Sequence, residues 1–168
     1  MILSRGCAAG ALNWTRSVVT RIGLTLNEAK TSIKRGRTER FDFLGYTFGP
    51  HRLRKNGHGY LGASPSKKSV FRLRQKVADV LVRHNVAPWP EVRAHLNSML
   101  RGWSNYFGYG TRLMAYRAVD HYVYERVRNF LRNRHKVSSR GTSRFSDAVV
   151  FGDLGVLRLR DVHLGRRP

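Results

Sequence analysis

Residues 64–133 carry apolar side chains at the period of an α-helix, and this pattern constrains the fold more than any other feature of the chain. Ser64, Pro65 and Ser66 open the first stretch, and serine is a favourable N-cap for a helix. With a step of about 100° per residue from Val70, the apolar residues of this stretch fall within one arc of about 100°. They are Val70, Leu73, Val77, Val80 and Leu81. We therefore predict an amphipathic helix that buries one face.

Two further stretches predict helices of the same kind. Pro90 can occupy the first turn of a helix, and the apolar face that follows carries Val92, Leu96, Met99, Leu100, Trp103, Tyr106 and Phe107. Gly108 and Gly110 end this helix. A third helix is expected near 113–133, and its inward residues are Val119, Tyr122, Val123, Val127 and Phe130. Three helices joined by short loops form a small bundle.

The faces opposite the apolar ones are basic. The chain has 32 Lys and Arg against 10 Asp and Glu, which gives a net charge of +22 and a pI near 11.5. A polyanion offsets the self-repulsion of such a chain, and nucleic acid is the first candidate because each phosphate contact releases counterions. The residues that we expect to contact RNA are Lys67, Lys68, Arg72, Lys76, Arg83, Arg93, Arg101, Asn105, Arg117, Arg128, Arg132, Arg134 and Lys136.

Two other interpretations of these charges stay open. An anionic membrane surface also attracts cations, although the chain has no run of about 18 apolar residues that could cross a bilayer. Alternatively, the charged faces are simply solvated, as such faces usually are. A solvated face normally mixes signs, however, and Asp79 is the one acid on the basic side of the first helix. Arg101 and Asn105 lie off the apolar face, where they suit the phosphates and 2′-hydroxyls through which A-form RNA is recognised.

The N-terminal part predicts mixed structure. Residues 8–22 are typical of a helix, and short strands are expected at 24–26 and 31–34. Residues 41–48 are strand-like, and Gly45 interrupts them, which suggests a bulge or the close approach of another backbone. The fold class is therefore α+β: a helix with short antiparallel strands and a hairpin, then the three-helix bundle and a basic tail.

The last 35 residues differ from the bundle. A basic run spaced by Ser and Gly contains Arg132, Arg134, His135, Lys136, Arg140 and Arg144. We expect either an arm that orders on RNA or a solvated linker, and we favour the arm. Hydrophobic residues at 148–151 and 156–159 predict one or two short strands. The expected units are thus 1–63, 64–133 and 134–168.

Two stretches, in this order and spacing, resemble the group II intron reverse transcriptase/maturase family. The first is GLTLNEAKT at 23–31 followed by FDFLGYTF at 41–48, and the second is LRGWSNYF at 100–107. The resemblance covers nearly the whole chain. It implies that 1–63 are the end of a reverse-transcriptase palm and that 64–133 are the thumb, or maturase-specific, domain that clamps intron RNA.

The resemblance also implies roles for single residues. Lys30 corresponds to a lysine near the incoming nucleotide, although in this chain it can equally be a relic with nothing to bind. The hairpin Phe43, Leu44, Gly45 and Tyr46 resembles the primer grip, which positions a strand end. Packing of this hairpin against the palm is the role that we favour over primer contact.

The chain departs from the family in its acidic residues. In the family a Tyr-Ala-Asp-Asp motif precedes the helix that matches residues 8–22, and this chain begins at what resembles the strand leaving that motif. Polymerases hold two metal ions with paired carboxylates, whereas the 10 acids here are scattered and no two are adjacent. We therefore expect no catalytic residue, no metal site and no cofactor, with Mg²⁺ expected only in a complete reverse transcriptase. Cys7 is the single cysteine, which fits a reducing cytoplasm.

The expected function is binding of structured group II intron RNA to assist splicing, without catalysis by the chain alone. One alternative is the C-terminal portion of a split or truncated RNA-directed DNA polymerase that needs a separate upstream palm and fingers fragment. Another is a gene fragment with generic nucleic-acid affinity. DNA is a second possible polyanion, no membrane partner is expected, and the expected location is the bacterial cytoplasm, with RNA or the nucleoid.

Overall fold

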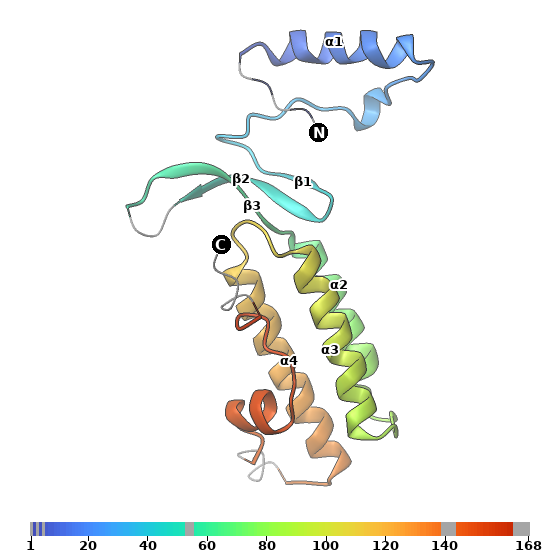
Figure 1. The fold of residues 1–168 in the computed structure, drawn as a ribbon, viewed down its shortest axis with the longest axis vertical. Helices are drawn as coiled ribbons and strands as arrows, with labels where there is room; N and C mark the ends of the chain where they lie inside the picture. Colours follow the sequence, from blue (N-terminus) through green and yellow to red (C-terminus); the bar gives the residue numbers. More distant parts are fainter. Residues whose placement is uncertain (1, 3, 5, 53–55, 139–143, 163–168) are drawn as a thin grey trace.

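The computed structural model describes residues 2, 4, 6–52, 56–138 and 144–162. A helix lies at one end of the molecule, a helical bundle at the other, and a small sheet between them (Figure 1). This arrangement confirms the predicted α+β class. The elements are α1 Ala8–Arg21, η1 Glu28–Lys30, β1 Phe41–Phe43, β2 Tyr46–Arg52, β3 Gly59–Pro65, α2 Lys67–Val80, α3 Trp89–Tyr106, α4 Leu113–Arg134 and η3 Val149–Asp153.

The three predicted helices of the bundle are confirmed, and their apolar faces form its core. Ser66 caps α2, because its Oγ accepts a hydrogen bond from the Ser69 backbone N–H at 3.1 Å. The fully or nearly fully buried hydrophobic residues of the three helices are Leu73, Val77, Val92, Leu96, Leu100, Tyr116, Val119, Val123, Val127, Phe130 and Leu131. Burial of each aliphatic side chain contributes about 1.5–3 kcal/mol, so this core is the main source of stability.

The described residues after α4, 144–162, complete the core of the bundle. Val150, Val156 and Leu159 are 0%, 2% and 0% exposed, and they belong to the same buried cluster as the helices. The strands predicted at 148–151 and 156–159 are wrong, because Val149–Asp153 form a single π-helical turn and the residues after it are irregular. The apolar character of these runs was identified correctly, but it reflects burial against α3 and α4 rather than a sheet.

The sheet is antiparallel in the order β1-β2-β3. Phe43 pairs with Tyr46, so Leu44 and Gly45 are the two residues of the hairpin turn. Their φ angles are 47° and 79°, and positive values at both positions are those of the type I′ turn that suits the twist of a hairpin. Gly45 is therefore in a tight turn with close neighbours, rather than in a bulge.

The strands predicted at 24–26 and 31–34 are also wrong. The Asn27 side chain accepts a hydrogen bond from the Lys30 backbone N–H at 3.2 Å and begins the short helix η1. Asparagine side chains commonly compete in this way with regular strand pairing. The segment around Asn27 is consequently a capped turn between α1 and the sheet.

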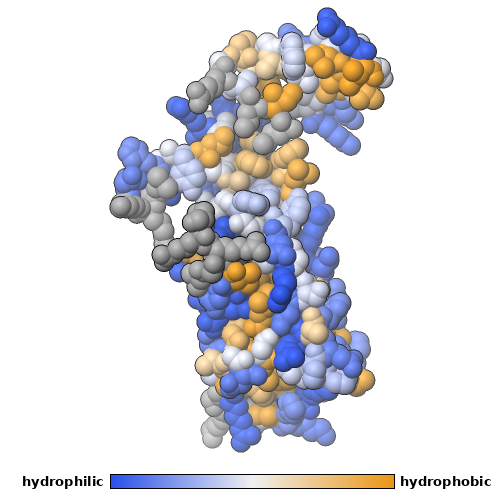
Figure 2. Space-filling model, viewed as in Figure 1, coloured by the Kyte–Doolittle hydropathy of each residue, from blue (hydrophilic) through white to orange (hydrophobic). Residues whose placement is uncertain are grey.

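The first helix buries little of its apolar surface. No residue of α1 is buried, and Trp14, Ile22 and Leu24 are 67%, 66% and 59% exposed. Figure 2 shows hydrophobic side chains at the surface at this end of the molecule. An ion pair between Arg16 Nε and Glu28 Oε1 at 2.8 Å joins α1 to η1. Within the described part of the chain, no helix has both the length and the apolarity needed to cross a bilayer.

Gly45→Ala should lower the free energy of unfolding by about 1–3 kcal/mol, because a residue with a side chain is strained at positive φ. A Cβ at this place would also lie 2.9 Å from Ser69 Oγ and 3.1 Å from the Phe107 ring. Urea denaturation of the parent chain and of the variant measures the change in stability. Gly102→Ala is the matched control, because a Cβ added at Gly102, in α3, would meet no atom within 4 Å apart from its chain neighbours and the backbone of its own helix. Alanine there should stabilise the helix by about 1 kcal/mol. Equal stabilities for the two variants would contradict the turn geometry.

Candidate nucleic-acid interface

The outer face of α2 carries a row of cations. Lys68, Arg72 and Lys76 follow one another at intervals of four residues and are all exposed. We call these three residues the α2 stripe. Residues spaced by four lie on the same side of a helix, about 6 Å apart along its axis. Within the described residues, none of the three forms an ion pair, so their charges are available to a ligand.

Six other predicted contact residues are exposed as well. They are Lys67 and Arg83 beside the α2 stripe, Arg101 and Asn105 on α3, Arg117 on α4, and Lys136 after α4. None of the cations among them forms an ion pair with another described residue. The α2 stripe is nevertheless the only set in which three predicted cations share one helical row, so it is the centre of the candidate interface.

The remaining four predicted residues form contacts within the fold or are half-buried. Arg134 donates through Nη1 to the Ala87 carbonyl at 2.7 Å and through Nη2 to the Val86 carbonyl at 3.3 Å. Its guanidinium thereby holds the loop between α2 and α3. Arg128 pairs with Glu125 at 3.7 Å, and Arg93 and Arg132 are half-buried. RNA contact by these four residues stays a prediction, and the geometry gives Arg134 a structural role in addition.

Two arginines that the sequence did not single out join α2 to α4. Arg74 Nη2 donates to the Ala118 carbonyl at 2.9 Å, and the guanidinium lies over the Tyr122 ring at 5.2 Å. Arg126 Nη2 donates to the carbonyls of Ala78 and Leu81 at 3.3 and 3.2 Å. The signal for Arg74 is its position on α2 next to the edge of the apolar arc, because a charge that lies there against a neighbouring helix must find partners in it.

Acidic residues are absent from two long stretches of the chain. Neither 43–78 nor 92–119 contains an Asp or Glu, and these stretches include β2, β3, most of α2 and nearly all of α3. Asp79, the acid next along α2, is exposed and forms no ion pair with a described residue. In the described part of the chain, no three His, Cys, Asp or Glu side chains are placed to hold a metal ion. Asp79 is therefore the one acid on α2, and the α2 stripe lies on a surface with a strong excess of positive charge.

The β1–β2 hairpin is fixed against the end of α3. Tyr46 Oη donates to the Tyr106 carbonyl at 2.8 Å, and Tyr106 Oη donates to the Leu44 carbonyl at 3.0 Å. Burial raises the pKa of Tyr46, so its hydroxyl stays protonated and able to donate. Tyr106 was predicted to face the core but is 55% exposed, because it lies in the last turn of α3, where the helix meets the hairpin instead of the bundle.

The residues assigned by resemblance are placed as follows. Phe43 and Leu44 are 37% and 68% exposed at the hairpin tip, and Gly45 accepts hydrogen bonds from the Ser66 N–H and the Ser69 hydroxyl, both at 2.8 Å. The hairpin thus packs on the bundle, while contact with a primer stays a prediction. Lys30 is exposed at the end of η1, in the segment between α1 and β1, which lies on the far side of the sheet from the bundle (Figure 1). Its nucleotide role stays a prediction.

Asp120 anchors the end of the chain to α4. Its carboxylate accepts hydrogen bonds from the backbone N–H groups of Leu159 at 2.8 Å and Arg160 at 3.3 Å. Asp120 is 2% exposed, and Arg160 Nε lies 3.4 Å from its Oδ2. Sequence reasoning missed this role, since the partners are about 40 residues away and nothing in the local pattern marks them.

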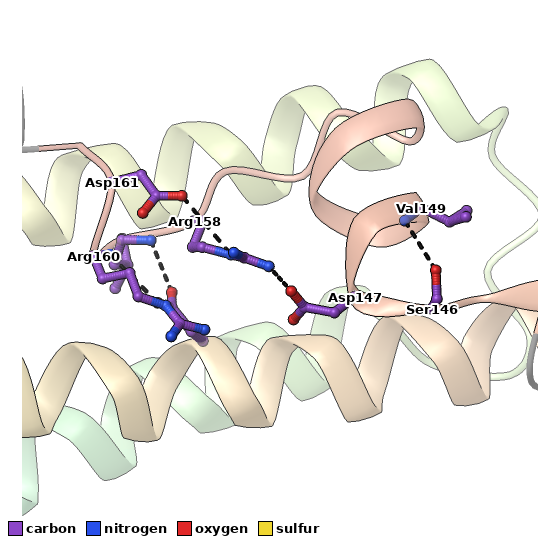
Figure 3. Close-up of polar contacts among 8 residues, drawn as sticks. Ser146, Asp147, Val149, Arg158, Arg160 and Asp161 are labelled. Atoms are coloured by element: carbon purple, nitrogen blue, oxygen red, sulfur yellow. Dashed lines mark hydrogen bonds and ion pairs between the residues drawn. The ribbon is translucent and has the colours of Figure 1, made fainter.

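Two further sets of contacts hold residues 144–162, which we call the C-terminal segment, against the rest of the bundle. Figure 3 shows Arg158 between Asp147 and Asp161, and it forms an ion pair with each of them. Asn97 on α3, which was expected to lie on the exposed face, donates to the Gly155 carbonyl and accepts from the Leu157 N–H, both at 2.8 Å. The segment is therefore part of the bundle, and it keeps α3 and α4, with their exposed cations, in fixed positions.

The Asp120 carboxyl should titrate above the ordinary pKa of an aspartate. Burial raises its pKa most strongly, while the two backbone N–H groups, Arg160 and Arg158 lower it. The folded chain then binds a proton in a pH range where the unfolded chain has released it, so this group adds stability as the pH falls through its folded pKa. A ¹³C NMR titration of the carboxyl, in native buffer and in urea, measures the shift. A native midpoint at or below the urea value would contradict it.

Arg140 of the predicted basic arm lies outside the described residues.

The helical bundle matches a known family. Residues 70–146 match the family model described as the group II intron, maturase-specific domain. The match begins in the first turn of α2 and continues past α4, so it includes most of the bundle and two residues of the α2 stripe. Comparison with curated proteins gives no match.

Proposed function

Residues 70–146 belong to the group II intron maturase-specific domain family, and from that premise we propose that this chain binds structured group II intron RNA and assists its splicing. The observation that carries the proposal is the α2 stripe: three exposed cations in one helical row, without ion pairs among the described residues. Phosphates offer the matching charge, and each contact releases counterions.

In the proposed mechanism the RNA and the protein have different roles. The intron RNA would carry out the reaction, while the protein supplies counter-charge and a rigid shape. A-form RNA is recognised mainly through its shape, phosphates and 2′-hydroxyls, and the exposed Arg101, Asn105 and Arg117 can extend contact from α2 onto the other helices. The proposed place of action is the bacterial cytoplasm, with RNA or the nucleoid.

A competition titration tests this function. Labelled group II intron RNA is bound to the full chain at physiological salt and displaced by unlabelled intron RNA or by an unrelated RNA duplex of equal length. We expect the unrelated duplex to compete at least tenfold less well, since specific binding exceeds phosphate attraction alone. If the two competitors displace the labelled RNA equally well, the chain has only generic affinity for nucleic acid and the proposed specific binding is rejected. A self-splicing assay with sub-saturating Mg²⁺ then measures whether the chain raises the splicing rate.

The exposed apolar residues of the N-terminal part favour a second candidate function. Trp14, Ile22 and Leu24 are each more than half exposed, and large exposed apolar patches commonly mark protein interfaces. The candidate partner is a separate polypeptide with the palm and fingers of a reverse transcriptase. Primer extension is measured with that polypeptide alone and after addition of this chain. If addition gives no increase in activity, this second function is rejected.

A further inference from the structure

An open groove lies between the first turns of α2 and α4, beside the end of β3. Its volume is about 490 Å³, which is within the range of about 300–1,000 Å³ of ligand pockets. The floor is apolar, with Val70 and Phe71 from α2 and Met114, Ala115 and Ala118 from α4. Phe71 is 59% and Met114 is 70% exposed, so the groove presents two large apolar side chains to solvent.

The polar groups of the groove are cations. Lys67 and Arg74 line it, and together with Phe71 they lie at positions i, i+4 and i+7 of α2, which form one side of the helix. Arg74 is held in place by the Ala118 carbonyl at 2.9 Å, and its buried Nε has no hydrogen-bond partner in the described part of the chain. The lining includes no acid, because it comes entirely from the two acid-free stretches 43–78 and 92–119.

An occupant of this groove has to be apolar on its faces and negatively charged around them. A peptide helix that buries an apolar face would satisfy the floor, but it would need additional acidic residues opposite Lys67, Arg74 and the neighbouring stripe. An unstacked nucleotide satisfies both requirements, because a base has a flat π-face and its phosphate is anionic. Protein modules commonly bind such splayed bases by stacking them on aromatic side chains.

We propose that the groove binds one unpaired base of the RNA, such as a bulged nucleotide, stacked on Phe71 with Met114 on its other side. Lys67 holds the adjoining phosphate, and the α2 stripe continues along the strand from there. The inference rests on the proposed function, and it names the structural element of the RNA that the chain recognises. Phe71 then provides discrimination between bulged and fully paired RNA, which phosphate contacts alone do not give.

The test compares two RNA hairpins that are identical except for one bulged nucleotide. Phe71→Ala should weaken binding of the full chain to the bulged hairpin by about 5- to 150-fold, the usual range for loss of one stacked base. Binding to the paired hairpin and the salt dependence should stay unchanged, because stacking releases no counterions. Phe71→Tyr should retain the affinity for the bulged hairpin and Phe71→Leu should lose it. Tyr109→Ala, which removes an aromatic residue that is 80% exposed and does not line the groove, is the matched control.

A second readout follows the groove directly. The methyl ¹³C–¹H signal of Met114 should shift upfield on addition of the bulged hairpin and should not shift with the paired one, because a stacked base exerts a ring current. If Phe71→Ala weakens neither hairpin or both equally, or if Phe71→Leu binds like the parent chain, the base-binding proposal is overturned and a purely apolar partner becomes the better occupant. Those outcomes leave the proposed function intact provided that replacement of the three α2 stripe residues by glutamine still lowers the affinity for intron RNA. Failure of the parent chain to prefer intron RNA would instead reject the proposed function.

Discussion

Replacement of Lys68, Arg72 and Lys76 together by glutamine should reduce the affinity for intron RNA about 100- to 1,000-fold at 0.1 M salt. Each phosphate contact contributes about 0.9 to the slope of log K against log salt, so three contacts contribute about 2.7. Between about 0.1 M and 1 M salt, a slope of that size corresponds to a factor of about 500. The three side chains are exposed and make no ion pairs with described residues, so their loss should leave the fold intact.

A titration at several salt concentrations measures the affinity and the slope together. The matched control replaces Arg21, Arg35 and Arg37 by glutamine, because these cations are equally exposed but lie in the N-terminal part, away from the bundle. The control removes the same net charge and should keep a slope close to that of the parent chain. If the two triple variants lose affinity and slope equally, net charge rather than the α2 stripe determines binding.

Asp120→Ala should lower the free energy of unfolding by about 2–5 kcal/mol. The substitution leaves the Leu159 and Arg160 N–H groups without their acceptor, which lies 2.8 and 3.3 Å from them. A buried donor without a partner costs about 1–3 kcal/mol. The same change removes the carboxylate beside Arg160 Nε. The end of the chain should then detach from α4, and Val156 and Leu159 should lose their burial.

Urea denaturation measures the stability of this variant, and amide hydrogen exchange of Leu159 and Arg160 measures the detachment. Asp79→Ala is the control, because Asp79 is exposed on α2 and substitutions of such surface residues usually change stability by less than about 0.5 kcal/mol. If Asp120→Ala were as stable as this control, with slow exchange at both amides, the anchoring role would be contradicted.

The three helices and the core of the bundle were predictable from the sequence. The positions of Leu73, Val77, Leu96, Val119 and Val127 follow a period of 3.6 residues, and all five are at most 3% exposed. A helical period is a strong local signal because each amphipathic face must be buried somewhere. The exposure of the α2 stripe followed from the same pattern, since it lies opposite the buried face.

The C-terminal segment could not be predicted in the same way. Its apolar runs are four residues long, and a run of that length does not distinguish a strand from a buried irregular segment. Its structure depends on acceptors that α3 and α4 supply, through Asn97 and Asp120, and these contacts span 58 to 60 and 39 to 40 residues. No local pattern contains that information.

The candidate site was also predictable only in part. The sequence identifies which residues are cations but not which of them bond to other parts of the fold. Arg134 and Lys68 were therefore indistinguishable as predicted RNA contacts. The structure separates them, because two loop carbonyls accept hydrogen bonds from Arg134, while Lys68 forms no ion pair with a described residue. The groove around Phe71 was also missed, since Phe71 lies outside the apolar arc of α2 and forms a groove only when Met114 of α4 is placed beside it.

The most direct test of RNA binding by the outer face of α2 is a lysine footprint of the full chain. Amines are acylated briefly with and without saturating intron RNA, and mass spectrometry measures the modification of each lysine. Lys68 and Lys76 should be protected at least severalfold, while Lys30 and Lys34 in the N-terminal part should be modified to the same extent in both samples. Equal modification of Lys68 and Lys76 with and without bound RNA would contradict binding through this face.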